Sequence, residues 1–284
     1  MRRGVLSRVR PLASNARQGV NSPQTVVLLH GAGADCAQLS WKYVLPRLLA
    51  RFRVLAPDLP GHGSTPELRE PTTAAYGAWL RGWLDQAAVE RASLVGLSLG
   101  GALALGYALD HPDRVERLVL VASYGLAPRV PYHALLRWLL HSPLRGLLAS
   151  SRLRGGVALR FGLRVLVGDP GALPAELLAD VRRAVAGTRP GLFWRWLRAE
   201  LEPARVRTCF RDRLGELRCP VLLVHGDRDR LVPLEHAREA ARRIPQAQLV
   251  VLAGCGHWPP RERPAEVCAA LEAFLAGVYS FHEA

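Results

Sequence analysis

The sequence predicts an α/β fold: a doubly wound, mostly parallel sheet with helices on both faces. Two observations lead to this prediction. Short apolar runs recur along the 284 residues, and stretches of helical character separate most of them. The runs are nearly continuous rather than alternating, which is typical of strands buried on both faces of a parallel sheet. Strands that alternate with helices in this way favour the doubly wound arrangement.

Six segments are strand candidates, and all but the second are nearly continuous apolar runs of this kind. We expect them at residues 26–29, 53–56, 92–95, 118–121, 221–224 and 249–252. Helices are expected after four of these strands, at residues 73–87, 99–110, 234–243 and 264–276. The first helix opens with threonine, a residue that caps helices, and the last has proline in its first turn.

Between residues 122 and 219 the alternation of strands and helices stops. Helix-like pieces at 131–140, 174–186 and 191–200 take its place, and no convincing strand accompanies them. We therefore expect a helical cap at 126–210, inserted into an α/β core made of 25–125 and 211–284. A basic segment at 1–24 precedes the core.

The formal net charge of +14 is concentrated outside the predicted core. Residues 1–24 carry five arginines and no acid, and residues 126–210 carry fourteen arginines against five acids. The basic groups of the cap accompany leucines, and no recognised nucleic-acid-binding motif accompanies them, so we expect no nucleic-acid partner.

Arginines in the first half of the cap follow a helical spacing. One polar stripe is predicted, with Arg137, His141 and Arg145 opposite Leu135, Leu139 and Leu140. A solvated helix face is the simplest interpretation of this stripe. The alternatives are attraction of a small-molecule substrate that is anionic or lipid-like, and contact with a membrane surface through the basic cap.

The five cysteines are odd in number and widely spaced, without a metal-binding pattern, so we expect them reduced and expect no metal or cofactor. No segment has the length of a membrane-spanning helix, because arginines interrupt every leucine-rich stretch. The basic N-terminal segment lacks the apolar region of a secretory signal. These observations lead us to expect a cytoplasmic protein.

The run Gly96-Leu97-Ser98-Leu99-Gly100 stands between a predicted strand and a predicted helix. A sharp turn at this point exposes a nucleophilic serine, and glycines on both sides let the turn approach its neighbours closely. By itself such a string is a weak signal, because it recurs by chance in chains of this composition.

Two further residues follow predicted strands in the order that a nucleophilic Ser98 requires. Asp229 lies in the loop after 221–224, and His257 lies in the loop after 249–252. Open α/β sheets place their sites at the carboxyl ends of strands, so these side chains are expected to meet. Asp227, on the same loop as Asp229, is the alternative acid.

The residue types fit covalent hydrolysis. Neutral imidazole titrates in the useful range, so His257 is the predicted base for the Ser98 hydroxyl. A carboxylate at the far ring nitrogen orients the imidazole and stabilises its charged form, the role expected of Asp229. Backbone amides of Leu99 and of either Ala32 or Gly33 are the predicted oxyanion hole.

With these motifs the chain resembles the α/β-hydrolase superfamily, in its serine-nucleophile, cap-containing form. The matching segments are residues 28–33, 56–64, 96–100, 226–233 and 256–258. The resemblance implies an eight-stranded, mostly parallel sheet with a helical cap after the sixth strand, and hydrolysis without metal or cofactor. Only 25 residues precede Val26, so we expect the antiparallel strands at the start of that sheet to be trimmed or poorly formed.

The leading functional prediction is a serine hydrolase that cleaves a carboxylic ester or a related acyl bond through an acyl-enzyme at Ser98. One alternative is hydrolysis of a carbon-carbon bond in ring-fission-type diketone acids, since some relatives with tryptophan after the histidine do this. Perhydrolase activity needs the same three residues. An alternative of another class is a non-catalytic ligand receptor with a hydrolase fold. Trp258 is either a substrate-binding wall or part of the core.

Overall fold

A computed structural model shows the protein's fold and describes residues 24–143, 156–172 and 175–278. Its sheet has the strand order β2-β1-β3-β4-β5-β6, and all neighbouring strands are parallel. The strands are β1 (Thr25–Leu29), β2 (Arg53–Leu55), β3 (Ala92–Leu97), β4 (Val115–Val121), β5 (Val221–Gly226) and β6 (Ala247–Leu252). The predicted fold class is therefore confirmed. The basic segment 1–24 lies outside the described residues except for Gln24.

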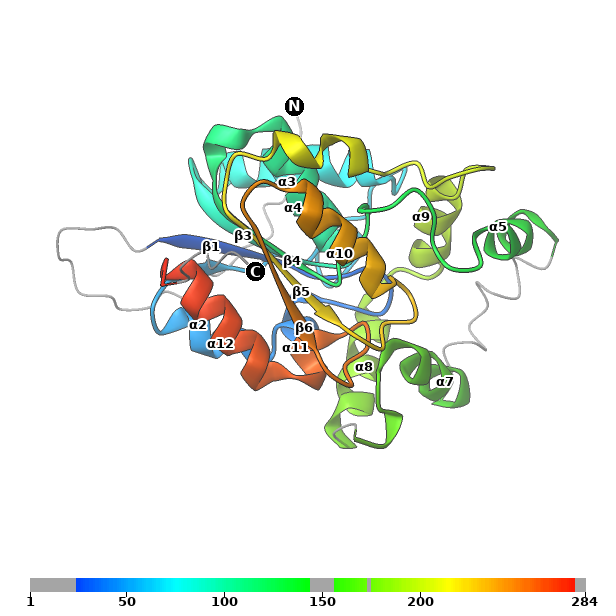
Figure 1. Cartoon of the computed structure of the whole chain (residues 1–284). Coiled ribbons are helices and arrows are strands. Elements are labelled where there is room, and N and C mark those ends of the chain that lie inside the picture. Colours follow the sequence, from blue (N-terminus) through cyan, green and yellow to red (C-terminus); the bar gives the residue numbers. More distant parts are fainter. Residues whose placement is uncertain (1–23, 144–155, 173–174, 279–284) are drawn as a thin grey trace, which may run out of the picture.

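Helices cover both faces of this sheet (Figure 1). One layer contains α3 (Thr73–Gln86), α4 (Leu99–Asp110) and α10 (Leu234–Arg243), and the other contains α1 (Ala37–Ser40), α2 (Val44–Leu49), α11 (Pro259–Glu262) and α12 (Pro264–Leu275). Each layer buries its own apolar cluster against the sheet. The central strand β3 is buried along its whole length, as expected for a strand covered on two faces.

The four helices predicted in the core are present, with small differences at their ends. The helices α3 and α12 (Pro264–Leu275) each end one residue earlier than expected, and a different threonine caps α3. Thr72 is the residue that caps it, with its hydroxyl accepting from the Ala75 amide at 3.2 Å. Thr73 instead donates its hydroxyl proton to a carboxylate of the insertion, Glu200, at 2.8 Å.

The insertion lies between β4 and β5 and is helical in its described part. It contains α5 (His133–His141), α7 (Gly156–Leu166), α8 (Ala175–Gly187) and α9 (Leu192–Glu200), which lie together at one end of the molecule (Figure 1). Counted within the described residues, the insertion follows the fourth strand, and the sheet has six strands. The resemblance implies eight strands and an insertion after the sixth. The two additional strands would precede β1, in residues that the structure does not describe.

The orientation of α5 differs from the predicted one. Leu140 is buried in the core, but the side chain of Leu135 is 59% exposed and Arg137 is half-buried. Leu136 packs against the core instead. The predicted stripe is therefore wrong at Leu135 and Arg137, because packing against α9 turns the helix so that Leu136 and Leu140 point inward. Arg145 lies outside the described residues.

Candidate active site

Ser98 stands at the turn between β3 and α4 in a strained backbone conformation, with φ of 52° and ψ of −112°. Its amide donates to the Val121 carbonyl at 2.9 Å, and its carbonyl accepts from the amides of Ala102 and Tyr124, each at 3.1 Å. These bonds hold a conformation that non-glycine residues rarely adopt. The strain presents the hydroxyl beyond the carboxyl end of the sheet.

Glycines permit this turn because backbone atoms surround it. A methyl group built on Gly96 would lie 2.2 Å from the Gly100 carbonyl oxygen, and one on Gly100 would lie 2.3 Å from the Leu29 carbonyl oxygen. Neither oxygen can move without shifting a strand or a helix. The two glycines of the motif are therefore needed for close approach of the backbone.

Ser98, His257 and Asp229 form a continuous hydrogen-bonded line. His257 Nε2 lies 3.0 Å from Ser98 Oγ, and His257 Nδ1 lies 2.7 Å from Asp229 Oδ2. A carboxylate only accepts, so Nδ1 donates to Asp229, and Nε2 is left to accept the Ser98 hydroxyl proton. The imidazole is thus in the tautomer that can remove a proton from serine.

Asp229 is buried in a site that favours its charged form. Burial by itself raises the pKa of this carboxyl, but the charge of His257 and hydrogen bonds from His225 and His257 hold it well below its usual range. The amides of Leu231 and Val232 donate to its other oxygen, each at 2.9 Å.

Asp227 has a different position from Asp229. Its side chain is exposed and accepts from the Gly254 amide at 2.7 Å. Of the two acids that the sequence left open, Asp229 is the one that contacts His257. Asp227 instead ties the loop after β5 to the loop after β6.

The turn at residues 30–33 lies directly beside Ser98. A methyl group built on Gly31 would be 3.6 Å from Ser98 Cβ. The Gly31 amide donates to Asp35 Oδ2 at 2.8 Å, so this amide is already engaged. His30 supports the turn from below, since its Nε2 accepts from the Leu59 amide at 2.9 Å. On this side of the site, the amides of Ala32 and Gly33 remain the candidate donors of the oxyanion hole.

Asp35 is a residue that sequence reasoning missed. It is buried, and burial raises the pKa of its carboxyl to about 7, although hydrogen bonds from Ser40, Gly31 and Cys36 act in the opposite direction. Ser40 Oγ lies 2.7 Å from Asp35 Oδ2 and accepts from Trp258 Nε1 at 2.9 Å. A single chain of hydrogen bonds thus joins the residue after His257 to the turn beside Ser98.

Trp258, the residue at one end of this chain of hydrogen bonds, lies inside the core. Its side chain is only 5% exposed and belongs to the apolar cluster under α12. Of the two interpretations offered by the sequence, this position favours packing over contact with a substrate. The indole supports the site indirectly, through Ser40.

Glu262, which was also not predicted from the sequence, fixes the loop around His257 through hydrogen bonds. Its carboxylate accepts from the amides of Gly256 at 3.0 Å and Trp258 at 3.1 Å, on either side of His257. It also accepts from the amide of Gly168, which follows α7 of the insertion, at 2.7 Å. One carboxylate therefore joins the loop of the predicted base to the helical insertion.

The insertion also contacts His257 itself. The His257 amide donates to the Leu166 carbonyl, the last residue of α7, at 2.6 Å. Methyl groups on Gly168 and Gly256 would each lie within 2.4 Å of a backbone atom of the opposing segment. The two segments pack backbone against backbone, so the end of α7 forms part of the wall that positions the imidazole.

Aromatic side chains of the insertion gather above the serine turn. The Phe193 ring would be 3.6 Å from a methyl group on Gly33, and it contacts Trp194 and Trp196 with ring centres 4.9 and 5.9 Å apart. Trp196 also packs edge-on against Tyr124, whose amide bonds to the Ser98 carbonyl. The approach to the predicted oxyanion turn is thus bordered by aromatic surface.

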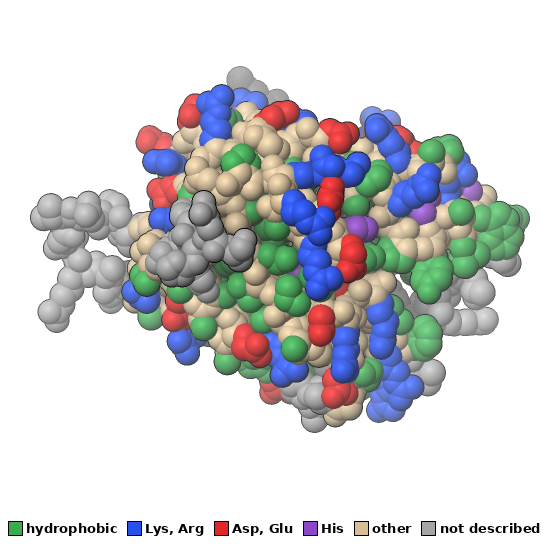
Figure 2. All heavy atoms as spheres, viewed as in Figure 1, with side chains coloured by type: hydrophobic (Ala, Val, Ile, Leu, Met, Phe, Trp, Pro, Cys, Tyr) green, Lys and Arg blue, Asp and Glu red, His purple; other side chains and the backbone are tan. Residues whose placement is uncertain are grey.

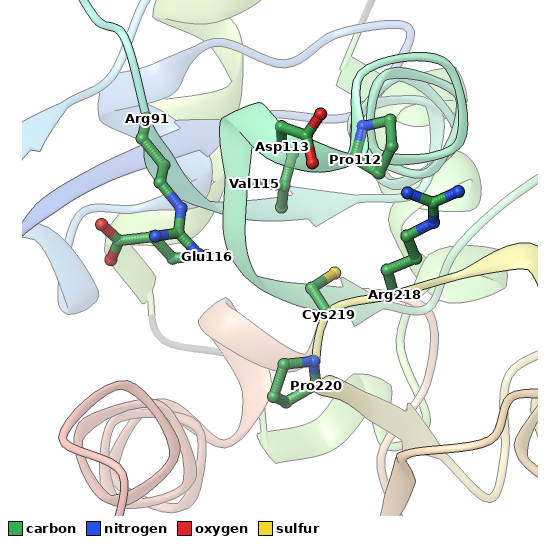
Figure 3. Close-up of a pocket in the computed structure, with 8 residues that line it drawn as sticks. All are labelled: Arg91, Pro112, Asp113, Val115, Glu116, Arg218, Cys219 and Pro220. Carbon is green, nitrogen blue, oxygen red and sulfur yellow. The ribbon is translucent and has the colours of Figure 1, made fainter.

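A surface cleft of about 390 Å³ lies at the amino ends of the central strands, on the opposite side of the sheet from Ser98 (Figure 3). Its lining comes from the segments that lead into β3, β4 and β5, and includes Arg91, Asp113, Glu116 and Arg218. These are the amino ends of the strands, whereas Ser98, Asp229 and His257 follow carboxyl ends. The cleft is therefore not part of the site described here.

Comparison with known proteins shows the family of this chain. The model of the alpha/beta hydrolase family matches residues 26–270, which is most of the chain. The chain belongs to the alpha/beta hydrolase family. The matched residues run from β1 through the insertion into α12.

The relatives of this hydrolase are named for two kinds of substrate, dienoate acids and a methyl ester. It is 34% identical to the 2-hydroxy-6-oxo-2,4-heptadienoate hydrolase of Pseudomonas putida, over 90% of this chain and 91% of the relative. It is also 34% identical to the pimeloyl-[acyl-carrier protein] methyl ester esterase of Aromatoleum aromaticum, over 91% of this chain and 100% of the relative. The solved meta-cleavage product hydrolase of Pseudomonas fluorescens IP01 superposes with a TM-score of 0.74 at 27% identity, covering 92% and 93% of the two chains. Hydrolysis is common to these relatives, and the bond cleaved differs.

Proposed function

We propose that this hydrolase cleaves a carboxylic ester through an acyl-enzyme at Ser98. The observation that carries the proposal is the line from Ser98 Oγ to His257 Nε2, at 3.0 Å, and from His257 Nδ1 to Asp229, at 2.7 Å. A hydroxyl, a correctly protonated imidazole and a buried carboxylate in this order are the parts that nucleophilic catalysis requires.

In the proposed reaction His257 Nε2 accepts the Ser98 proton while Ser98 Oγ attacks the ester carbonyl. The tetrahedral oxyanion collapses, the bond to the alcohol oxygen breaks, and the imidazolium returns its proton to the leaving alcohol. Water then attacks the acyl-enzyme with His257 again as base, which releases the acid and restores Ser98. Asp229 stabilises the imidazolium in both halves.

The oxyanion would be held by backbone amides. We assign the Leu99 amide, at the first position of the twelve-residue helix α4, and an amide from Ala32 or Gly33. The aligned peptide dipoles of α4 add favourable potential where the negative charge develops. Engagement of the Gly31 amide by Asp35 fixes the turn in place, so these donors need little rearrangement during the reaction.

The acyl or alcohol group of the substrate is proposed to be apolar. Phe193 and its aromatic neighbours on α9 border the approach to the oxyanion turn. Binding sites for small molecules combine such apolar walls with few polar groups. The esterase relative supports ester cleavage as the reaction.

Labelling and turnover test the proposal together. The purified full chain should react with a fluorophosphonate probe and hydrolyse short p-nitrophenyl esters, and Ser98→Ala should abolish both. Ser123→Ala is a matched control, since Ser123 is buried nearby and donates to its neighbour's carbonyl at 2.9 Å. Full esterase activity in Ser98→Ala would refute the mechanism, and a folded wild type without labelling would favour a ligand receptor.

A second candidate is cleavage of a carbon-carbon bond in a 2-hydroxy-6-oxo-dienoate. It is favoured by the relative of that name and by the similar meta-cleavage product hydrolase structure. Such acids are anionic and would suit the arginine-rich insertion. Side-by-side kcat/KM values for a ring-fission acid and for p-nitrophenyl esters separate the candidates, because a large preference for the acid would overturn ester cleavage as the main reaction.

A further inference from the structure

Large apolar side chains are exposed on the helical insertion. Tyr132, Leu135 and Trp138 are 78%, 59% and 61% exposed, and they follow one another at intervals of three along α5 and its first flanking residue. Phe161, on α7, is 68% exposed. We call these four side chains the apolar cap face. Figure 2 shows hydrophobic side chains gathered at the end of the molecule where α5 lies.

The apolar cap face does not serve the packing of its own helix. Leu136 and Leu140 already bury the opposite side of α5 against the core and the neighbouring α9. Large exposed side chains that follow one another along one side of a helix, as Tyr132, Leu135 and Trp138 do, mark an interaction surface more often than apolar residues exposed singly. A partner that accepts apolar side chains is therefore needed to explain them.

The charge of the surrounding chain selects the kind of partner. The described residues of the surrounding chain, 126–143 and 156–168, contain four arginines and no aspartate or glutamate. Arg160 and Arg164 flank Phe161 and are exposed, and exposed Arg129 stands three residues before Tyr132. A second copy of the chain would bring the same positive charges together. A negatively charged surface that also admits apolar groups fits both features.

We propose that the apolar cap face docks on an anionic lipid surface. Tyr132 and Trp138 have the amphipathic rings that favour the boundary between headgroups and acyl chains, and Leu135 and Phe161 supply apolar area. The arginines interact with lipid phosphates, and each contributes favourably only while it lies close to the surface. This mode is peripheral: no helix among the described residues is both long and apolar enough to cross a bilayer.

Docking in this way would place the active site near the membrane. The apolar cap face belongs to the same helical insertion as Phe193, which borders the turn at Gly33, and as the end of α7, which contacts His257. This consequence rests on the proposed ester hydrolysis and extends it to esters that partition into lipid. The docking itself can be measured without turnover, so the two proposals can fail separately.

Vesicle sedimentation tests the docking. The full chain is mixed with vesicles of equal parts phosphatidylglycerol and phosphatidylcholine, or of phosphatidylcholine alone, at low and high salt. We expect binding to the anionic vesicles to be stronger by about tenfold or more and to weaken as salt rises. Leu135→Ser with Trp138→Ser, and separately Arg160→Gln with Arg164→Gln, should each weaken it by about tenfold.

Val278→Ser is the matched control, because Val278 is 72% exposed on the core and should leave binding unchanged. All variants should hydrolyse a soluble p-nitrophenyl ester like the wild type, which verifies that they are folded. Absence of binding, or equal binding to both kinds of vesicle, would overturn the proposal. So would a wild-type dimer, seen by light scattering, that the Leu135 and Trp138 substitutions dissociate, since a second copy would then cover the face.

Discussion

Replacing Glu262 with alanine should impair catalysis without touching any reacting atom. The carboxylate accepts three backbone amides, from Gly256, Trp258 and Gly168, at 2.7 to 3.1 Å. All three of these residues are buried. An amide left without its acceptor in such a place costs about 1–3 kcal/mol. Glu262 is itself half-buried, so water will replace part of the lost bonding, and we expect a net loss of about 2–4 kcal/mol in unfolding free energy.

Catalysis should be impaired as well as stability, because His257 lies between two of the released amides. A displacement of the imidazole by about 1 Å is enough to reduce turnover by about a hundredfold. We therefore expect kcat for p-nitrophenyl ester hydrolysis to fall by about 10- to 100-fold, with KM little changed. Glu262→Gln keeps one carbonyl acceptor and should restore most of the rate.

The assay is steady-state kinetics at a temperature where circular dichroism shows each variant folded. Glu266→Ala is the control, since Glu266 is an exposed acid of the adjacent helix α12. If folded Glu262→Ala kept kcat within about twofold of the wild type, the inference that this carboxylate positions His257 would be refuted. An equal loss in Glu262→Gln would point to the negative charge rather than to the accepted amides.

Three further substitutions test the rest of the site, and a fourth, in α3, is a control outside it. Asp229→Asn should lower kcat by about 10³- to 10⁴-fold with little change in KM, because the amide no longer holds the required imidazole tautomer. Asp35→Asn should remove a pH dependence of stability: a pKa of about 7 in the fold against 3.8 means that the wild type loses about 2–3 kcal/mol between pH 5 and pH 9, and urea titrations should show that the variant does not. Gly100→Ala should destabilise the fold strongly, since the new methyl would lie 2.3 Å from the Leu29 carbonyl oxygen, whereas Gly82→Ala, with open space around it in α3, should raise the thermal midpoint slightly.

The sheet and the order of the site residues could be predicted because each depends on local patterns. Strands buried on both faces leave continuous apolar runs, and all six predicted strands are present. The helix after Ser98 has the predicted bounds, Leu99–Asp110, because a glycine-flanked serine and the end of a small-residue run mark its limits. Each of Ser98, Asp229 and His257 follows the carboxyl end of a strand, and because the strands are parallel these residues meet at one edge of the sheet.

The insertion was harder to predict because packing, more than local sequence, decides its details. The helix α7 was missed, and Gly162 in its middle weakens the local helical signal. The rotation of α5, which exposes Leu135, depends on its neighbour α9. The choice between Asp227 and Asp229 also needs the fold, since two acids two residues apart differ only in which distant group they reach.

Asp35 and Glu262 escaped prediction for a common reason that also describes how the site is built. Each is a carboxylate that accepts backbone amides from segments far along the chain, so no spacing of residue types marks it. Asp35 fixes the turn of the predicted oxyanion amides and connects through Ser40 to Trp258, while Glu262 binds the Trp258 amide and the end of α7. His257 therefore lies between two carboxylate-centred supports, one in the core and one shared with the insertion. A change that moves the end of α7 should act directly on His257, the predicted base, so we expect the insertion to position this side chain as well as to border the approach to the predicted oxyanion turn.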